Sequence, residues 1–91
     1  MKIQQFGFND NKLVDFQMEQ NPSMYFQFTF QHDIQKQCYY LNVRQFKNTE
    51  SYSGPTKNGF RLTIQDEFEL ERLQDHFNKL FDEAKKAMEE Q

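Results

Sequence analysis

Residues 24–31 read Met-Tyr-Phe-Gln-Phe-Thr-Phe-Gln, so that apolar side chains occupy every second position. Successive side chains of a strand point to opposite faces of its sheet. The pattern therefore predicts a strand with one buried and one solvated face, as is common in antiparallel sheets. Even-numbered residues from Met24 to Phe30 are expected on the buried face, and odd-numbered residues from Tyr25 to Gln31 on the solvated face.

Further extended segments are expected on both sides of this strand. They are residues 2–8, as a first strand or an extended arm, and residues 12–19, 37–46 and 59–64. Turn-forming residues separate them. These lie at Asn9-Asp10-Asn11, at Asn21-Pro22-Ser23, in a hairpin loop over 32–36, and in a polar loop over 47–58 that contains Gly54-Pro55.

The last part of the chain is expected to form one helix. Residues 65–91 lack Gly and Pro, carry acidic residues early, and have Lys85 and Lys86 late, as the helix dipole favours. Thr63 or Gln65 is expected to cap it. Apolar residues recur at helical spacing, and we expect this stripe to cover the Phe-rich sheet face. The stripe comprises Phe68, Leu73, Phe77, Leu80, Phe81, Ala84 and Met88.

These elements predict a single domain over residues 1–91 of the α+β class. A four- to five-stranded antiparallel curved sheet (2–64) is followed by one long C-terminal helix (65–90). The sheet face away from the helix is then expected to be polar. It would carry Gln17, Tyr25, Gln27, Thr29, Tyr40, Asn42, Arg44, Arg61 and Thr63.

The net charge of −3 is unevenly distributed along the chain. Residues 65–91 hold nine acidic and four basic residues, a balance of −5, whereas residues 1–64 hold five acidic and seven basic residues, a balance of +2. The polar face can thus be weakly basic although the chain is acidic, and a local field steers ligands more than the total charge does. The single cysteine, the absence of a signal peptide and the lack of a long apolar run predict an intracellular protein with no membrane contact.

No pattern in the sequence indicates an enzyme. His32, His76 and Cys38 do not have the spacing of metal ligands or of a nucleophile with its base. The three glycines, at positions 7, 54 and 59, do not form a phosphate-binding loop. We therefore expect no catalytic residues, no metal and no cofactor.

The polar face instead has the composition of a surface that binds single strands. Aromatic rings can stack on bases, cations can contact phosphates, and amides can bond the edges of unpaired bases. The candidate rings are Tyr25, Tyr40 and Phe46, the candidate amides are Gln27 and Asn42, and the candidate cations are Arg44, Lys47, Lys57 and Arg61. The alternative is that Tyr and Gln simply cover a solvated face, or that this face packs against a second copy.

Two stretches, Tyr40-Leu41-Asn42-Val43-Arg44-Gln45-Phe46 and Gly54-Pro55-Thr56-Lys57-Asn58-Gly59-Phe60-Arg61-Leu62, carry a family resemblance. Together they resemble the single-strand-binding transcriptional coactivators of the positive cofactor four type. Arg61-Leu62-Thr63-Ile64 and the helix through Phe77 and Phe81 are also similar to the purine-rich-element-binding (PUR) repeats.

The resemblance covers roughly residues 12–86 and implies four strands and a helix that bind single-stranded DNA or RNA as a pair of repeats. It implies that Arg44 is the strand arginine with Phe46 as its aromatic neighbour, that Lys57 and Gly59 belong to a basic loop, and that Arg61 lies on the last strand. It also implies a nuclear role in transcription or replication. The loop is poorer in basic residues than the family pattern, and residues 24–31 contain none.

The helix has an apolar stripe that is wide enough to serve a partner as well as its own sheet. Leu70, Phe77, Phe81 and Met88 are the candidate residues for a homodimer or for a heteromeric complex with a similar domain. The alternative function is a protein-interaction module or an assembly subunit without nucleic-acid contact. A pleckstrin-homology-like fold of this kind needs more strands than the sequence offers.

Overall fold

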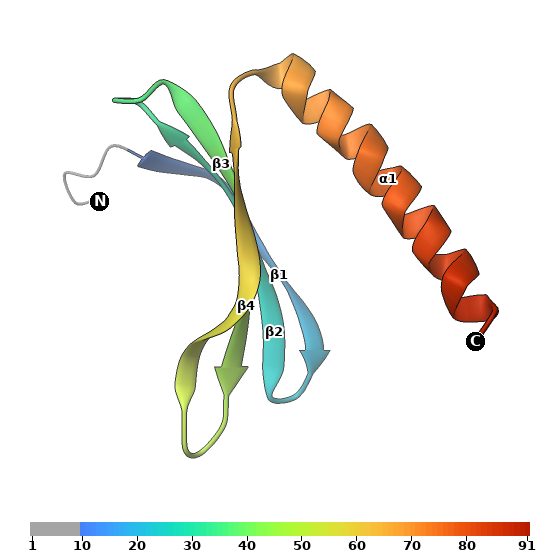
Figure 1. Cartoon of the computed structure of the whole chain (residues 1–91). Coiled ribbons are helices and arrows are strands. Elements are labelled where there is room, and N and C mark those ends of the chain that lie inside the picture. The colour runs from blue at the N-terminus through green and yellow to red at the C-terminus, as the bar shows by residue number, and fades with distance from the viewer. Residues whose placement is uncertain (1–9) are drawn as a thin grey trace.

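A computed structural model describes residues 10–91, and it shows a four-stranded sheet followed by a long helix (Figure 1). The strands are β1 (Asp10–Asn21), β2 (Met24–Asp33), β3 (Cys38–Asn48) and β4 (Ser53–Ile64), and the helix is α1 (Glu67–Glu89). Each strand pairs antiparallel with the next, in the order β1-β2-β3-β4. The predicted α+β class and the open antiparallel sheet with a C-terminal helix are confirmed.

Several predicted boundaries were wrong, each because a strand continues through residues that usually mark turns. β1 already includes Asp10 and Asn11, and β2 continues to Asp33, so the turn comprises residues 34–37. β4 starts at Ser53 and includes Gly54-Pro55, which leaves a loop of residues 49–52 instead of 47–58. Proline is tolerated there because β4 is an edge strand. The extended segment predicted over residues 2–8 lies outside the described residues.

Pairing between the strands separates the side chains into two faces, as predicted from alternation. Phe28 pairs with Phe16 on one side and with Val43 on the other, and Val43 pairs in turn with Phe60. We call this side the apolar face. Its apolar and aromatic members are Val14, Phe16, Met18, the even-numbered residues from Met24 to Phe30, Tyr39, Leu41, Val43, Phe60, Leu62 and Ile64.

Rings of the apolar face stack along and across the strands. Phe16 and Phe28 have ring centroids 5.2 Å apart, and Phe30 and Tyr39 have centroids 5.3 Å apart. The amide of Gln45 is also on this side, yet it is buried and bonded to Gln20 (2.8 Å) and to Asn58 (2.8 Å). Because its polar atoms have partners, Gln45 tolerates burial beside aromatic rings.

Helix α1 begins with Asp66 as its N-cap, not with Thr63 or Gln65 as predicted. The Asp66 carboxylate accepts from the backbone N–H of Glu69 (2.8 Å), and the Glu69 carboxylate accepts from the backbone N–H of Gln65 (2.7 Å). The first bond satisfies a donor that the first helical turn leaves unpaired, and the second ties the residue before the N-cap to that turn. Among the described residues no helix has the apolar stretch that would cross a lipid bilayer.

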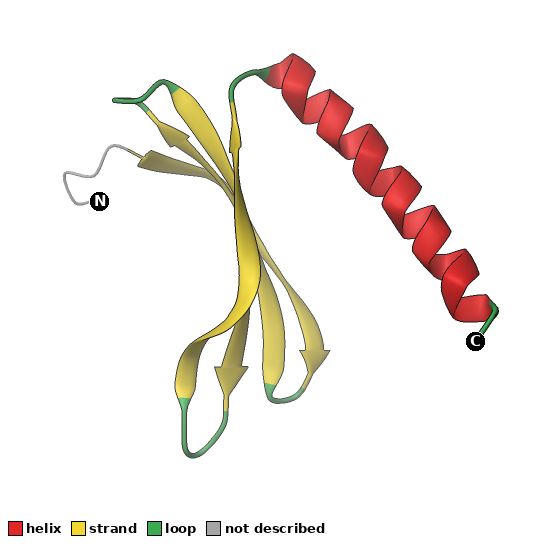
Figure 2. Ribbon diagram, viewed as in Figure 1, coloured by secondary structure: helices red, strands yellow, loops and turns green. Residues whose placement is uncertain are grey.

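The helix covers much less of the sheet than expected. Among the four described strands its backbone comes close only to β4, where Phe77 packs against Phe60 with ring centroids 6.3 Å apart. Figure 2 shows the helix standing away from the rest of the sheet. Phe68 was also wrongly placed on the stripe, because it is nine residues before Phe77, which is two and a half turns at about 3.6 residues per turn. Phe68 is 68% exposed on the outer side of the helix.

A consequence is that little of the apolar face is buried. In residues 12–91 the only buried apolar side chains are Cys38, Tyr40 and Ile64, and of these only Ile64 belongs to the apolar face. On β1, Val14, Phe16 and Met18 are 46%, 57% and 49% exposed. The strands therefore form a two-sided sheet whose apolar side is exposed along β1 and half-buried over β2 and β3.

Candidate nucleic-acid interface

The opposite side of the sheet collects the polar residues that alternation assigned to it. Gln27 pairs with both Gln17 and Arg44, and Asn42 pairs with both Thr29 and Arg61. We call this side the polar face. It comprises Asp15, Gln17, Glu19, the odd-numbered residues from Tyr25 to Gln31, Asp33, Cys38, the even-numbered residues from Tyr40 to Phe46, Arg61 and Thr63.

Arg44 and Arg61 share this face, as predicted, and no other element of the described chain covers it. Asn42 pairs with Arg61, while Arg44, two residues further along β3, pairs with Gly59. Within residues 10–91 the helix approaches the sheet at β4 and on the apolar face, where Phe77 meets Phe60. The middle of the polar face, away from the buried Asp33, Cys38 and Tyr40, is therefore left open by the described residues.

A shallow depression of about 510 Å³ marks the middle of the polar face. Its lining combines amides, a hydroxyl, two cations, a carboxylate and a ring. The residues are Lys12, Asp15, Gln17, Gln27, Thr29, Gln31, Asn42, Arg44 and Phe46.

Amide side chains in the depression are held by bonds across the strands. Gln27 donates to the Asp15 carboxylate and accepts from the Gln17 amide (3.1 Å). The Asn42 amide donates to Gln31 Oε1 (2.6 Å) on the neighbouring strand. An amide offers two N–H donors and two acceptor lone pairs, so these side chains are oriented and retain capacity for the edge of a base.

The two arginines are each held by a different neighbour. Arg44 donates through Nη1 to the backbone carbonyl of Thr56 (3.2 Å). The guanidinium carbon of Arg61 lies 3.6 Å from the centroid of the Tyr40 ring, a cation–π arrangement. A guanidinium has five N–H donors, so both side chains keep donors for a phosphate while their positions are restricted.

Tyr40 lies on the predicted face, but its ring is buried and covered by Arg61. Its hydroxyl donates to Asp33 Oδ2 (2.7 Å). This hydrogen bond lowers the pKa of Asp33, aided by the backbone N–H of Lys36, and it raises the pKa of Tyr40 to about 12. In this arrangement Tyr40 positions Arg61 and does not offer a free ring face to a base.

A second pair of rings is better placed for stacking. Tyr25 and Phe46 are paired residues on β2 and β3, with centroids 5.3 Å apart and ring planes 6° from parallel. Both are half-buried at the end of the polar face where the β1–β2 turn lies. They form a small aromatic ledge beside the depression.

The two predicted lysines are separated from the arginines. Lys47 follows Phe46 and pairs with Met24, which assigns it to the apolar side of the sheet and corrects its predicted place. Lys57 is exposed in the irregular part of β4, where the pairing register shifts between Arg44 and Phe46. The expected basic loop is therefore an edge-strand bulge.

Lys12, Asp15 and Gln31 also line the depression but were not among the predicted binding residues, although alternation had placed Gln31 on the solvated face. Strict alternation puts Lys12 on the same side as Val14, but a register shift between these two residues turns Lys12 to the polar face. There Lys12 forms an ion pair with Asp15 (3.6 Å). A bulge of this kind depends on cross-strand pairing and leaves no distinct signal in the residues themselves.

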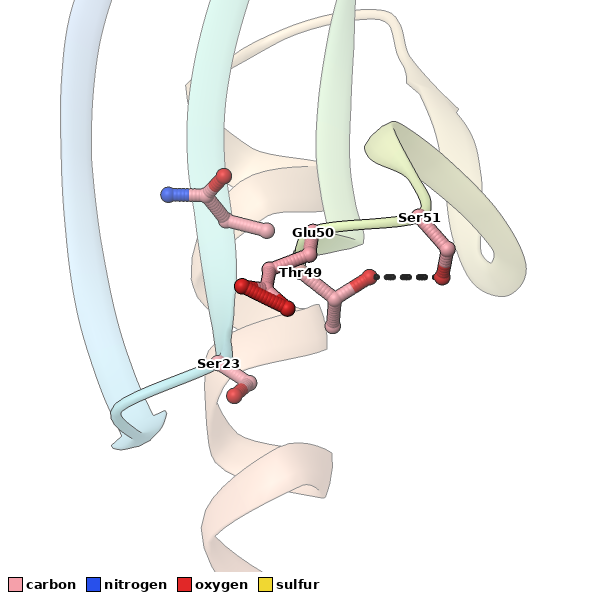
Figure 3. A pocket seen from close by; sticks show the side chains of 5 residues that line it. Ser23, Thr49, Glu50 and Ser51 are labelled. Atoms are coloured by element: carbon pink, nitrogen blue, oxygen red, sulfur yellow. Dashed lines mark hydrogen bonds between the residues drawn. The ribbon is translucent and has the colours of Figure 1, made fainter.

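A second hollow, of about 770 Å³, lies between the β1–β2 turn and the β3–β4 loop (Figure 3). Ser23, Asn48, Thr49, Glu50 and Ser51 line it, and the hydroxyls of Thr49 and Ser51 are 3.4 Å apart. None of the predicted binding residues belongs to it. Glu50 is its only charged residue, so it does not extend the cationic part of the polar face.

Within residues 12–91 no group of three His, Cys, Asp or Glu side chains gathers as a metal site would require. A scan of protein-family models and searches of curated proteins and solved structures found no match to this chain.

Proposed function

We propose that this protein binds single-stranded DNA or RNA through its polar face and performs no catalysis. The observation that supports the proposal most directly is the in-register cluster of Gln27 with Arg44 and of Asn42 with Arg61 on one uncovered face. Rings, oriented amides and cations on an open sheet are the means by which single strands are recognised. The resemblance to the coactivator and PUR families adds a nuclear role in transcription or replication to this proposal.

Charges on the face suggest how a strand would lie. Arg44 and Arg61 are on β3 and β4, whereas the carboxylates of Asp15 and Glu19 are on β1. Phosphates are favoured over the β3–β4 half, and bases over the amides of β1 and β2. Since Lys12 is already paired with Asp15, two arginines provide most of the phosphate contacts.

The expected binding is weak and depends modestly on salt. Two neutralised phosphates give a slope of log K against log salt of roughly −1.4 on single strands. Fluorescence anisotropy with labelled oligothymidylate, an RNA of the same length and a duplex would measure both the affinity and the slope at low salt. Binding to the duplex equal to that of the single strands would contradict the proposal.

A double variant, Arg44→Ala with Arg61→Ala, tests whether the polar face binds the strand. A second double variant, Lys85→Ala with Lys86→Ala, is the matched control. Both double variants remove two positive charges, but the lysines lie in the last turns of α1, away from the polar face. We expect the arginine variant to lose binding and its salt slope, and the lysine variant to retain both. Equal losses would mean that the net charge, not this face, attracts the strand.

An assembly subunit without nucleic-acid contact is the second candidate, because large apolar side chains such as Phe16 and Phe81 are 57% exposed. Exposed apolar surface of this kind marks interaction sites in soluble proteins. If the anisotropy panel shows no binding of any strand at low salt while the protein is folded, this second function replaces the first.

A further inference from the structure

The apolar face of the sheet and the stripe on α1 are both incompletely covered within one chain. On β1, Val14, Phe16 and Met18 are about half exposed, and on α1, Leu80, Phe81 and Met88 are 56%, 57% and 75% exposed. The Cα radius of gyration is 16.0 Å, whereas a compact domain of 91 residues has about 12 Å. The chain is thus more open than a single folded domain of its size.

From this we infer that two copies of the chain pair through their apolar faces, with α1 of each copy lying over β1 and β2 of the other. The inference concerns the side of the sheet opposite to the proposed nucleic-acid interface. It stands or falls independently of nucleic-acid binding, because the two faces share no side chain.

The first observation that supports pairing is the size of the exposed apolar area. The three exposed side chains on β1 and the three on α1 are between 46% and 75% exposed, and they contribute on the order of 100 Å² each, or about 600 Å² together. Stable interfaces bury about 800 Å² per partner. The half-buried rings between them, Phe26, Phe28 and Phe30, supply the remainder of the area that a stable pair requires.

The second support is the complementarity between the two uncovered surfaces. Neither Val14, Phe16 and Met18 nor Leu80, Phe81 and Met88 includes a charged side chain. On the helix stripe Phe77 packs against Phe60 of β4, whereas Leu80, Phe81 and Met88 in the C-terminal half of α1 stay exposed. The free helix stripe of one copy can therefore cover the free sheet face of the other copy.

A dimer with two-fold symmetry covers the helix stripe and the sheet face at the same time. In an isologous dimer the contact of helix with strand occurs twice, so the free stripe and the free face of both copies are covered together. An unrelated partner that covered β1 would leave the helix stripe exposed. This is the reason for choosing a second copy of the chain as the occupant.

Light scattering coupled to size-exclusion chromatography tests the inference across the micromolar range, with Phe16→Glu as the test variant and Phe68→Glu as its control. Both replace an exposed Phe by Glu, but Phe68 lies on the outer side of α1. We expect a dimeric mass for the wild type and for Phe68→Glu, and a halved mass for Phe16→Glu. Far-UV circular dichroism would verify that each variant is folded.

Leu80→Glu provides a second arm on the helix in case Phe16→Glu fails to fold, and it should also halve the mass. A monomeric wild type at every concentration would overturn the inference, as would a dimer that survives the substitution at Leu80. Dimer loss with unchanged oligonucleotide anisotropy would support this pairing and leave the proposed function intact. Loss of oligonucleotide binding in a protein that is still dimeric would count only against the proposed function.

Discussion

The two faces of the sheet are built from the same strands but differ in the kind of side chain they carry and in the interactions that hold it. On β2, Phe28 pairs with Phe16 and Val43 on the neighbouring strands, whereas Thr29, one residue later, pairs with Asp15 and Asn42. The apolar face gains free energy from removing rings from water, and the polar face gains orientation from cross-strand hydrogen bonds. A shift of a single residue along the strand therefore moves a side chain from the apolar face to the polar face.

The comparison also shows which face is complete. Side chains of the polar face hold one another, as Tyr40 holds Arg61 and Gln27 bonds Gln17. The apolar face has stacked rings but little cover, since α1 contacts only β4. Hydrogen bonds and a cation–π contact thus organise the polar face within one chain, whereas the apolar face keeps exposed side chains.

The largest expected effect comes from a residue on which both faces depend. Gly59 has a φ of +152°, and a Cβ there would lie 2.4 Å from the Val43 carbonyl oxygen. Gly59→Ala combines backbone strain of about 1–3 kcal/mol with this clash, and it should loosen the β3–β4 pairing beneath both faces. Urea denaturation should show a lower midpoint than the wild type, with Lys57→Ala as an exposed control nearby. An unchanged midpoint would mean that the edge strand adapts without cost.

An intermediate effect separates the contributions of the two faces to stability. Phe28→Ala removes a half-buried ring stacked on Phe16 and should lower the free energy of unfolding by about 2 kcal/mol. Thr29→Ala, at the adjacent position, should cost less than about 1 kcal/mol. Thermal and urea unfolding of both variants would measure the difference. Equal costs would contradict the assignment of stability to the apolar face.

The smallest effect concerns pH and belongs to the polar face alone. The Tyr40 hydroxyl lowers the pKa of Asp33 from its ordinary 3.8, so this carboxylate stabilises the fold fully above pH 3.8 and less as the pH falls toward its folded value. The pKa of Tyr40 is raised from 10.0 to about 12, so its contribution is complete below pH 10 and is lost as the pH rises toward 12.

Tyr40→Phe should remove the alkaline dependence and reduce the acidic one, since the backbone N–H of Lys36 still bonds Asp33, and so leave the profile of melting temperature against pH flatter at its two ends. Circular dichroism melts from acidic to alkaline pH would measure it. Thr63→Val, a substitution on the same face next to Tyr40 in the pairing, is a suitable control. A wild-type profile retained in Tyr40→Phe would assign the pH dependence to other groups.

Much of the architecture could be predicted because it is local. The alternation over residues 24–31 determines which side chains share a face, and the spacing from Leu70 to Met88 determines the helix stripe, since both follow from the geometry of one element. The common face of Arg44 and Arg61 followed in the same way from the alternation of β3 and β4.

What alternation and spacing could not decide depends on contacts between elements. The bulge that turns Lys12 toward Asp15, the continuation of β4 through Pro55 and the cover of Arg61 over Tyr40 all arise from pairing with a neighbouring strand. The sequence by itself determined the two-sided strands and the long amphipathic helix, because side-chain direction has a fixed period in each. Only the tertiary structure decided that the helix leaves much of the apolar face uncovered. Its position over the sheet depends on where β4 ends and on the direction of the connection to α1, and neither follows from a periodicity.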